Sequence, residues 1–150
     1  MTIAPTNPGD SCNNLALRKA AWYLGATYDK ALAPVGLRAT QLSILQKLSV
    51  HREMTISGLA DVIAMDRTTM ASNLKPLVRE GLVTVESSAA DRRARIAAIT
   101  PDGLTRLKTA LPLWNAVQAQ FEENFGADGA AHLRAYLEAV LHTGFEPWAE

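Results

Sequence analysis

The spacing of the apolar residues changes at Gly81, and this change constrains the fold more than any other feature. Between residues 66 and 80 the apolar side chains recur at steps of three and four, which is the spacing of one helix face. In residues 82–86 and 95–99, apolar and β-branched side chains form two short stretches typical of strands. A polar loop, residues 87–94, separates these stretches. The sequence therefore predicts a helix followed directly by a β-hairpin.

Two capping residues indicate that a shorter helix precedes this one. Thr55 can accept a hydrogen bond from the backbone at the start of a short helix, and Asp66 can do the same for a helix that begins at Arg67. Gly81 ends the second helix, because glycine readily adopts the left-handed conformation found just after helices. Residues 55–81 are therefore predicted to form a helix, a tight turn and a second helix.

Longer helical patterns flank this region on both sides. Apolar residues at helical spacing run from 13 to 33, where Pro34 and Gly36 end the pattern. Thr40 is a candidate N-cap for a further helix. The N-terminal third is therefore predicted to hold one long helix and one shorter helix.

The C-terminal third begins with a strong helix start signal. Thr100 is a candidate cap, and Pro101 occupies the first helical position, where proline is well tolerated. The apolar stripe continues to Phe125, with a kink expected at Pro112, and a last helix begins near Gly126. The predicted fold is mainly α with a small β-hairpin wing (α+β), a winged helix-turn-helix with long N- and C-terminal helices.

The composition indicates one globular domain. Of the 150 residues, 48% are hydrophobic and 20% are charged, which is enough to bury a single core. No uncharged apolar stretch is long enough to span a bilayer, and residues 1–11 lack the features of a secretory signal. We expect a cytoplasmic protein with no membrane partner, in which residues 1–11 form a disordered lead-in and residues 12–150 form one domain.

Residues that support metal binding or catalysis are sparse. The single cysteine, Cys12, excludes an internal disulfide, and the three histidines lie too far apart for a ligand motif. The chain has no glycine-rich phosphate loop and no G-x-S-x-G motif. We therefore expect no metal, no cofactor and no enzymatic activity.

Positive charge gathers at the tip of the predicted hairpin. The net charge of the chain is zero, whereas many DNA-binding domains are basic. However, Arg92, Arg93 and Arg95 fall within one span of four residues. An arginine on a protruding loop can enter the narrow minor groove of DNA, and Asp91 can orient the Arg93 guanidinium through paired hydrogen bonds. The alternative is a solvated charged turn.

The helix from Arg67 has the composition of a DNA-reading helix. One side is apolar, and the other carries short hydroxyl side chains that can reach base edges in the major groove. We expect the short polar side chains to contact bases, Lys75 to contact a phosphate, and Arg67 to contact a phosphate or support the wing. The alternative is an ordinary solvated surface helix. The predicted DNA-binding residues are Arg67, Thr68, Thr69, Ser72, Asn73, Lys75, Asp91, Arg92, Arg93 and Arg95.

The stretch from Thr55 to Gly103 resembles the MarR family of bacterial regulators. It contains the capped helix DRTTMASNLKPLVREGLV, the hairpin AADRRAR and the segment ITPDG. The resemblance implies a homodimeric transcription regulator, a repressor, that binds a pseudo-palindromic operator in double-stranded DNA. It also implies that Asp91 and Arg93 are the paired residues of the wing.

The resemblance divides the chain into two functional parts. Residues 12–36 and 101–146 would supply the dimerisation helices, and residues 38–100 would form the DNA-binding lobe. Two positions depart from the family pattern, because many relatives have an arginine where this chain has Ser72, and Pro76 lies inside the DNA-reading helix. The base preference of relatives therefore does not transfer to this chain.

The resemblance also implies a small aromatic or phenolic effector, held in a crevice between the dimer helices and the DNA-binding lobes. The alternative is that the aromatic residues belong to the dimer core and that His51 is an ordinary loop histidine. The candidate effector residues are Trp22, Tyr23, Tyr28, Arg38 and His51.

Two further hypotheses concern regulation and partners. One branch of the family senses peroxides through a single cysteine near the start of its first helix, which makes Cys12 a candidate redox residue. Asn13 and Asn14 beside it supply no cation to stabilise a thiolate, which favours an ordinary thiol. The second hypothesis is a winged-helix protein-interaction module that does not bind DNA.

Overall fold

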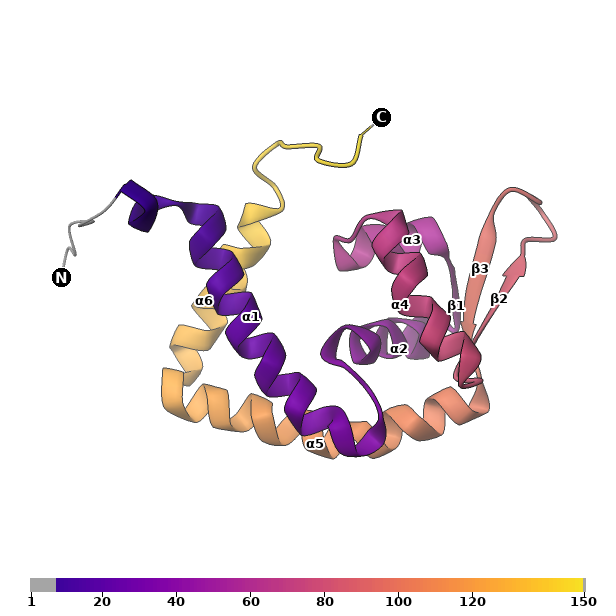
Figure 1. Cartoon of the computed structure of the whole chain (residues 1–150), viewed down its shortest axis with the longest axis horizontal. Helices are drawn as coiled ribbons and strands as arrows, with labels where there is room; N and C mark the ends of the chain where they lie inside the picture. Colours follow the sequence, from indigo (N-terminus) through magenta and orange to yellow (C-terminus); the bar gives the residue numbers. More distant parts are fainter. Residues whose placement is uncertain (1–7, 150) are drawn as a thin grey trace.

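The computed structural model describes residues 8–149 and is mainly helical, with a small antiparallel sheet (Figure 1). This confirms the predicted fold class. The elements are η1 (Pro8–Ser11), α1 (Asn13–Leu32), η2 (Ala33–Val35), α2 (Ala39–His51), β1 (Glu53–Thr55), α3 (Ile56–Ile63), α4 (Arg67–Arg79), β2 (Val83–Ser87), β3 (Arg95–Ile99), α5 (Pro101–Phe125) and α6 (Ala127–Val140).

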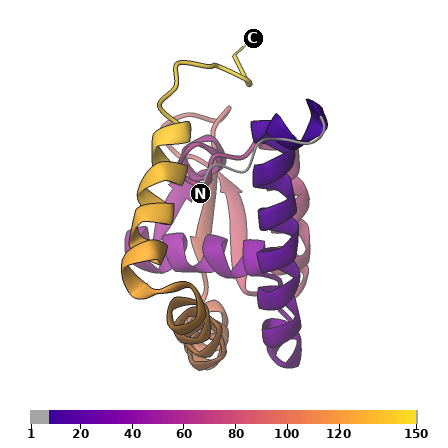
Figure 2. The same ribbon diagram turned by 90° about the vertical axis from the view of Figure 1, so that its left-hand side faces the viewer.

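The helices divide into a winged lobe and an open frame. The winged lobe consists of α2, α3, α4 and the sheet, and it sits on the N-terminal half of α5 (Figure 1). The frame consists of α1, α6 and the rest of α5, with α1 and α6 extending from α5 on the side away from the hairpin (Figures 1 and 2). The β2–β3 hairpin projects from the opposite end of the molecule as a wing.

The hydrophobic core lies almost entirely in the winged lobe. Buried side chains of α2, α3 and α4 meet those of the sheet, and Leu32 of α1, Leu37, and Leu107 and Ala110 of α5 complete the cluster. Burying apolar surface is the main stabilising term in folding, so this core stabilises the winged lobe. In contrast, α6 has one buried residue among positions 127–140, which is Ala130. The frame therefore leaves many of its apolar side chains exposed.

Three of the four predicted helix caps are confirmed. The side chains of Thr55, Asp66 and Thr100 accept hydrogen bonds from the backbone of the third residue after them. Thr40 as an N-cap is wrong, because α2 begins at Ala39. There the Ala39 N–H donates to Asp29 Oδ1 of α1 at 2.7 Å, and the Arg38 N–H donates to Gln41 Oε1 at 3.0 Å.

The sheet has three strands in the order β1-β3-β2. The predicted hairpin is present, with Val83 opposite Ile99 and Ser87 opposite Arg95. β1 is a strand that the sequence did not predict, and it pairs with β3 through Glu53 and Ala98. Three residues are too few for an alternating pattern to be visible, so β1 becomes recognisable only through its partner strand.

Both ends of the described chain bear on the expected boundaries. Within the expected lead-in of residues 1–11, Pro8–Ser11 form the short 3-10 helix η1. The rest of that prediction, residues 1–7, lies outside the described residues. At the other end α6 stops at Val140, short of residue 146, and Gly144 then adopts a left-handed φ of 88°.

α5 runs as one helix from Pro101 to Phe125, through Pro112. Among the helices of residues 8–149, none is long and apolar enough to cross a membrane.

Candidate nucleic-acid interface

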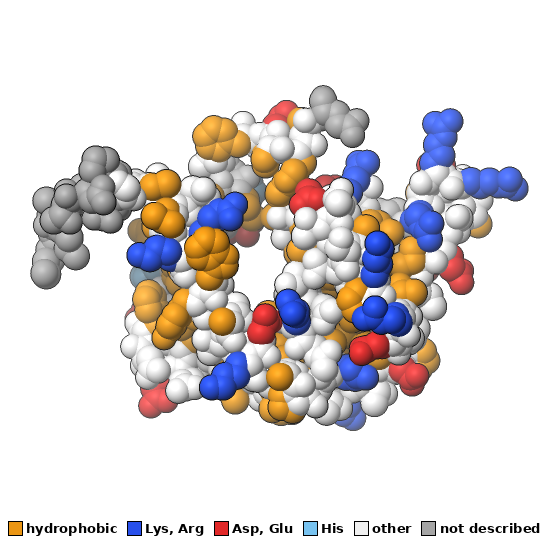
Figure 3. All heavy atoms as spheres, in the orientation of Figure 1, with side chains coloured by type: hydrophobic (Ala, Val, Ile, Leu, Met, Phe, Trp, Pro, Cys, Tyr) orange, Lys and Arg blue, Asp and Glu red, His pale blue; other side chains and the backbone are white. Residues whose placement is uncertain are grey.

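α4 separates its apolar and polar residues onto two faces. Met70, Leu74 and Leu77 are buried against the lobe. Exposed residues, mostly short hydroxyl side chains and cations, lie on the rest of the helix, and Lys and Arg side chains spread over α4 and the hairpin on one side of the molecule (Figure 3). The exposed predicted DNA-binding residues of α4 are Arg67, Thr68, Thr69, Ser72 and Lys75.

The start of α4 is held by a two-point contact between Asp66 and Thr69. The Thr69 N–H donates to Asp66 Oδ1 at 2.8 Å, and the Thr69 hydroxyl donates to Asp66 Oδ2 at 2.6 Å. The bond from the Thr69 hydroxyl, which has the largest effect, and the bond from the Thr69 N–H lower the pKa of Asp66 below its ordinary value of 3.8. Since its proton is committed to Asp66, the Thr69 hydroxyl presents its oxygen to a partner as an acceptor.

Asn73 differs from the other predicted residues of α4. It is half-buried, and its side-chain amide donates to the Thr69 carbonyl at 2.9 Å. A second contact of the same nitrogen reaches Met65 Sδ at 3.9 Å. The side-chain NH2 group of Asn73 therefore lies against its own helix, so Asn73 is not one of the exposed predicted DNA-binding residues of α4.

The wing tip is ordered by local hydrogen bonds. The Ser88 hydroxyl oxygen accepts from the Ala90 N–H at 3.2 Å, and the Ser88 N–H donates to the Ala94 carbonyl at 2.8 Å. Asp91 Oδ1 accepts from the backbone N–H of Arg93 at 3.0 Å. The predicted paired bonds from Asp91 to the Arg93 guanidinium are therefore wrong, because the carboxylate holds the turn of the backbone instead.

The arginines of the wing are exposed and available. Arg92, Arg93 and Arg95 take part in none of the ion pairs found among residues 8–149. Positively charged side chains stand clear of the hairpin tip in Figure 3. A preorganised backbone that carries unpaired guanidinium groups loses little conformational entropy when it meets an anion.

The predicted effector residues do not converge within one chain. Trp22 and Tyr23 are 61% and 76% exposed on α1. Arg38 and His51 lie at opposite ends of α2, roughly 20 Å apart at the helical rise per residue. The structure has an open groove of about 610 Å³ between η2 and α5, and none of the five residues lines it.

Tyr28 already has a protein partner. Its hydroxyl donates to Gln118 Oε1 of α5 at 2.7 Å. Burial and the nearby Glu122 carboxylate raise the pKa of Tyr28, and Arg134 acts in the opposite direction. Gln118, which interrupts the apolar stripe of α5, therefore serves as the partner of a half-buried tyrosine.

Cys12 is exposed and caps the start of α1. Its sulfur accepts a hydrogen bond from the Leu15 N–H at 3.4 Å. This contact accounts for Cys12 at the N-cap of α1 and does not require a redox role for it.

The frame exposes many large apolar side chains, more than the sequence reasoning singled out. They lie on α1, the end of α5, α6 and the segment after α6. The aromatic residues of that segment were not predicted, because they come after the last apolar pattern with helical spacing. The set comprises Leu15, Trp22, Tyr23, Phe125, Tyr136, Leu137, Val140, Leu141, Phe145 and Trp148.

Comparison with known proteins agrees with this arrangement. The sequence model of the MarR family matches residues 37–94, which lie in the winged lobe. A structure of the Mycobacterium tuberculosis transcriptional regulator MosR in complex with DNA is 38% identical. It covers 87% of this chain and 98% of that chain, with a TM-score of 0.73.

Two curated relatives extend the comparison. The transcriptional activatory protein BadR of Rhodopseudomonas palustris is 26% identical over 149 residues, covering 93% of this chain and 85% of its own length. An uncharacterised helix-turn-helix regulator of Staphylococcus aureus is 32% identical over 63 residues. That match covers 42% of this chain and less than half, 43%, of the relative.

The resemblance seen in the sequence is therefore confirmed over most of the chain. MosR matches nearly from end to end, and the family model matches the lobe that holds α4 and the wing. The chain belongs to the MarR family of transcription regulators.

Proposed function

We propose that this protein is a homodimeric, sequence-specific DNA-binding transcription regulator. One observation carries the proposal: the exposed polar face of α4 and the exposed arginines of the wing belong to one lobe, in which α4 contacts β2 of the hairpin. In this arrangement α4 enters the major groove, where base edges are distinguishable, and the wing follows the adjacent minor groove. The MosR structure in complex with DNA supports the same partner.

A second copy of the chain covers the frame. Leu137 of α6 is 41% exposed and Trp22 of α1 is 61% exposed, although both side chains are strongly apolar. Large exposed apolar surfaces often mark association sites. A symmetric dimer uses the same patch on both chains and presents two α4 helices to one duplex, so the operator is pseudo-palindromic.

We propose repression as the output and a small aromatic molecule as the inducer. A dimer that occupies a promoter excludes the polymerase, which makes repression the simplest consequence of binding. BadR is named an activatory protein, so whether this protein represses or activates transcription is measured separately. A reporter gene behind the recovered operator should be silenced by the protein, and increased expression would show activation instead.

The test of DNA binding is selection from random duplexes at two salt concentrations. We expect enrichment of an inverted repeat with half-site centres about 10 base pairs apart, and an affinity that falls steeply with salt because phosphate contacts release counterions. A folded dimer that enriches nothing would contradict the proposal and favour a winged-helix protein-interaction module.

A further inference from the structure

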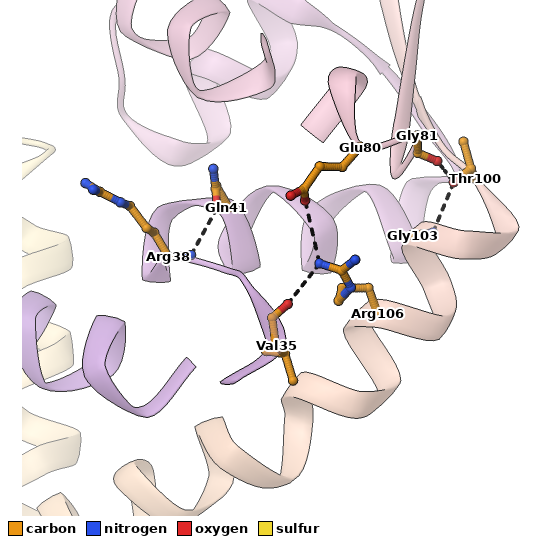
Figure 4. Close-up of polar contacts among 8 residues, drawn as sticks. All are labelled: Val35, Arg38, Gln41, Glu80, Gly81, Thr100, Gly103 and Arg106. Carbon is orange, nitrogen blue, oxygen red and sulfur yellow. Dashed lines mark hydrogen bonds and ion pairs between the residues drawn. The ribbon is translucent and has the colours of Figure 1, made fainter. Parts of the chain in front are cut away.

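The end of α4 meets α5 and η2 at a polar joint, which we define by Val35, Glu80 and Arg106 (Figure 4). Arg106 Nη1 of α5 donates to the Val35 carbonyl at 2.9 Å. The same nitrogen lies 3.6 Å from Glu80 Oε2, just after the last residue of α4. One side chain of α5 thus reaches both the end of α4 and the link between α1 and α2.

The turn after η2 is shaped around this guanidinium. Gly36 has a φ of 69°, a conformation that strains other residues. A Cβ atom at Gly36 would also lie 3.3 Å from Arg106 Nη1. The turn therefore approaches Arg106 more closely than a residue with a side chain would comfortably allow.

A separate backbone contact fastens the end of α4 to the start of α5. The Thr100 hydroxyl donates to the Gly81 carbonyl at 2.7 Å (Figure 4). The Thr100 N–H donates to the Leu82 carbonyl at 3.1 Å. A Cβ atom at Gly103 would collide with the Leu82 carbonyl oxygen. These contacts join α4 to α5, but they do not reach η2.

Apolar packing does not close the space around the joint. An open groove of about 610 Å³ lies there, lined by Pro34, Leu82 and Thr105 together with the three joint residues. Leu32 and Leu37, on either side of η2, are buried in the core, and Val35 packs against it. The contacts of Arg106 add a polar link from η2 and the end of α4 to α5, beside the open groove. Arg106 is half-buried, which shields its contacts from solvent only in part.

We propose that Arg106 is a positioning residue that fixes the angle between α4 and the dimerisation helices α1 and α5. This inference rests on the proposed function, because the angle matters only if two α4 helices must match one duplex. The distance between the α4 helices of a dimer depends on that angle. Arg106 therefore sets which half-site spacing the dimer accepts, without touching DNA.

The first test measures the joint without DNA. Arg106→Met keeps the aliphatic stem and removes the charge, and Lys108→Met is the matched control. Lys108 is exposed on the same helix and makes none of the hydrogen bonds or ion pairs found among residues 8–149. Amide hydrogen exchange across residues 36–37 should be faster in Arg106→Met and unchanged in the control. Unchanged exchange in Arg106→Met would overturn the proposal.

The second test measures spacing on DNA. Duplexes with the half-sites moved one base pair closer or farther should bind the wild type more weakly by a factor on the order of ten. Arg106→Met should lose most of this discrimination and keep its base preference within each half-site. Retained discrimination would contradict the proposal. Failure of the wild type to bind any duplex would refute the proposed function instead, and the exchange experiment would still decide whether Arg106 holds the joint.

A more conservative variant keeps the proposal testable if Arg106→Met does not fold. Arg106→Lys keeps a positive charge for Glu80 but cannot present a guanidinium to two partners at once. It should fold, as circular dichroism would verify, and show the same changes in exchange and spacing to a smaller extent. Wild-type behaviour in this variant, together with a misfolded Arg106→Met, would overturn the assignment.

Discussion

Single side chains on the wing and on α4 make two different kinds of contact in the proposed complex. Arg93 stands on an ordered turn and is exposed, so it meets the sugar-phosphate backbone and the minor groove, whose features vary little among sequences. Ser72 lies on the exposed face of α4, where a hydroxyl can reach a base edge. In the proposed complex, affinity and sequence preference would therefore reside on different elements.

Substitution of Arg93 should weaken binding to all duplexes alike. Arg93→Ala removes one cation from the wing, so the slope of log affinity against log salt should fall in magnitude by about one. Fluorescence anisotropy at several salt concentrations measures both quantities. An unchanged salt dependence would show that Arg93 does not contact phosphate.

Substitution of Ser72 should change preference at one base position. Ser72→Ala should reduce discrimination there by about 1 kcal/mol and leave the salt dependence as it was. Competition among duplexes that differ at single positions measures this. If Ser72→Ala and Arg93→Ala had the same effect on every duplex, the division between reading and anchoring would be wrong.

Residue types could be predicted better than their partners. The exposed positions of α4 follow from helical periodicity, because three buried apolar residues determine which way the rest must face. The partner of Asp91 did not follow, since spacing alone cannot distinguish a bond to the Arg93 backbone from one to its guanidinium. Likewise, the bond from Asn73 to the Thr69 carbonyl depends on a side-chain rotamer.

Elements with local start and stop signals were predictable, and elements that depend on distant partners were not. α4 begins after Asp66 and ends before Gly81, because a capping side chain and a left-handed glycine act within one turn. α2 instead begins one residue before Thr40, where Asp29 of α1 accepts from the Ala39 N–H and Gln41 accepts from the Arg38 N–H. β1 exists only because β3 pairs with it.

The cap of α4 should give stability a specific pH dependence. The folded state lowers the pKa of Asp66 from 3.8, so the charged carboxylate stabilises the fold. This contribution is fully present above the unfolded pKa and is lost as the pH falls through the lower folded pKa. Asp66→Asn keeps an oxygen for the Thr69 N–H but cannot titrate.

The difference in melting temperature between wild type and Asp66→Asn measures this effect. The difference should be constant at neutral pH and should shrink below about pH 4, because the other carboxylates are common to both proteins. A difference that stays constant into strong acid would show that the Asp66 charge does not stabilise α4.

In the whole molecule, the frame and the winged lobe have different requirements. The lobe buries its own core, whereas α1 and α6 expose apolar side chains that a single chain leaves uncovered. In the proposed dimer, association of two chains by these helices would link stability to oligomeric state and would place both α4 helices on one assembly.

A charge on α6 should therefore separate the dimer. Leu137→Asp puts a carboxylate into the proposed interface, and burying it unpaired is costly. Light scattering should find a monomer, and operator affinity should be lost with it. Val50→Asp is the control, because Val50 is a 75% exposed apolar residue in the winged lobe, and this variant should stay dimeric. A dimer in Leu137→Asp that still binds DNA would place the interface elsewhere.

Hydroxyl-radical footprinting of the dimer on its selected duplex would show whether α4 and the wing bind DNA as proposed. We expect two protected half-sites about one helical turn apart on one face of the duplex, with protected minor-groove positions at the outer edges. The outer protection should disappear in Arg93→Ala while both half-sites persist. A single protected patch, or outer protection that survives the loss of Arg93, would contradict this proposal.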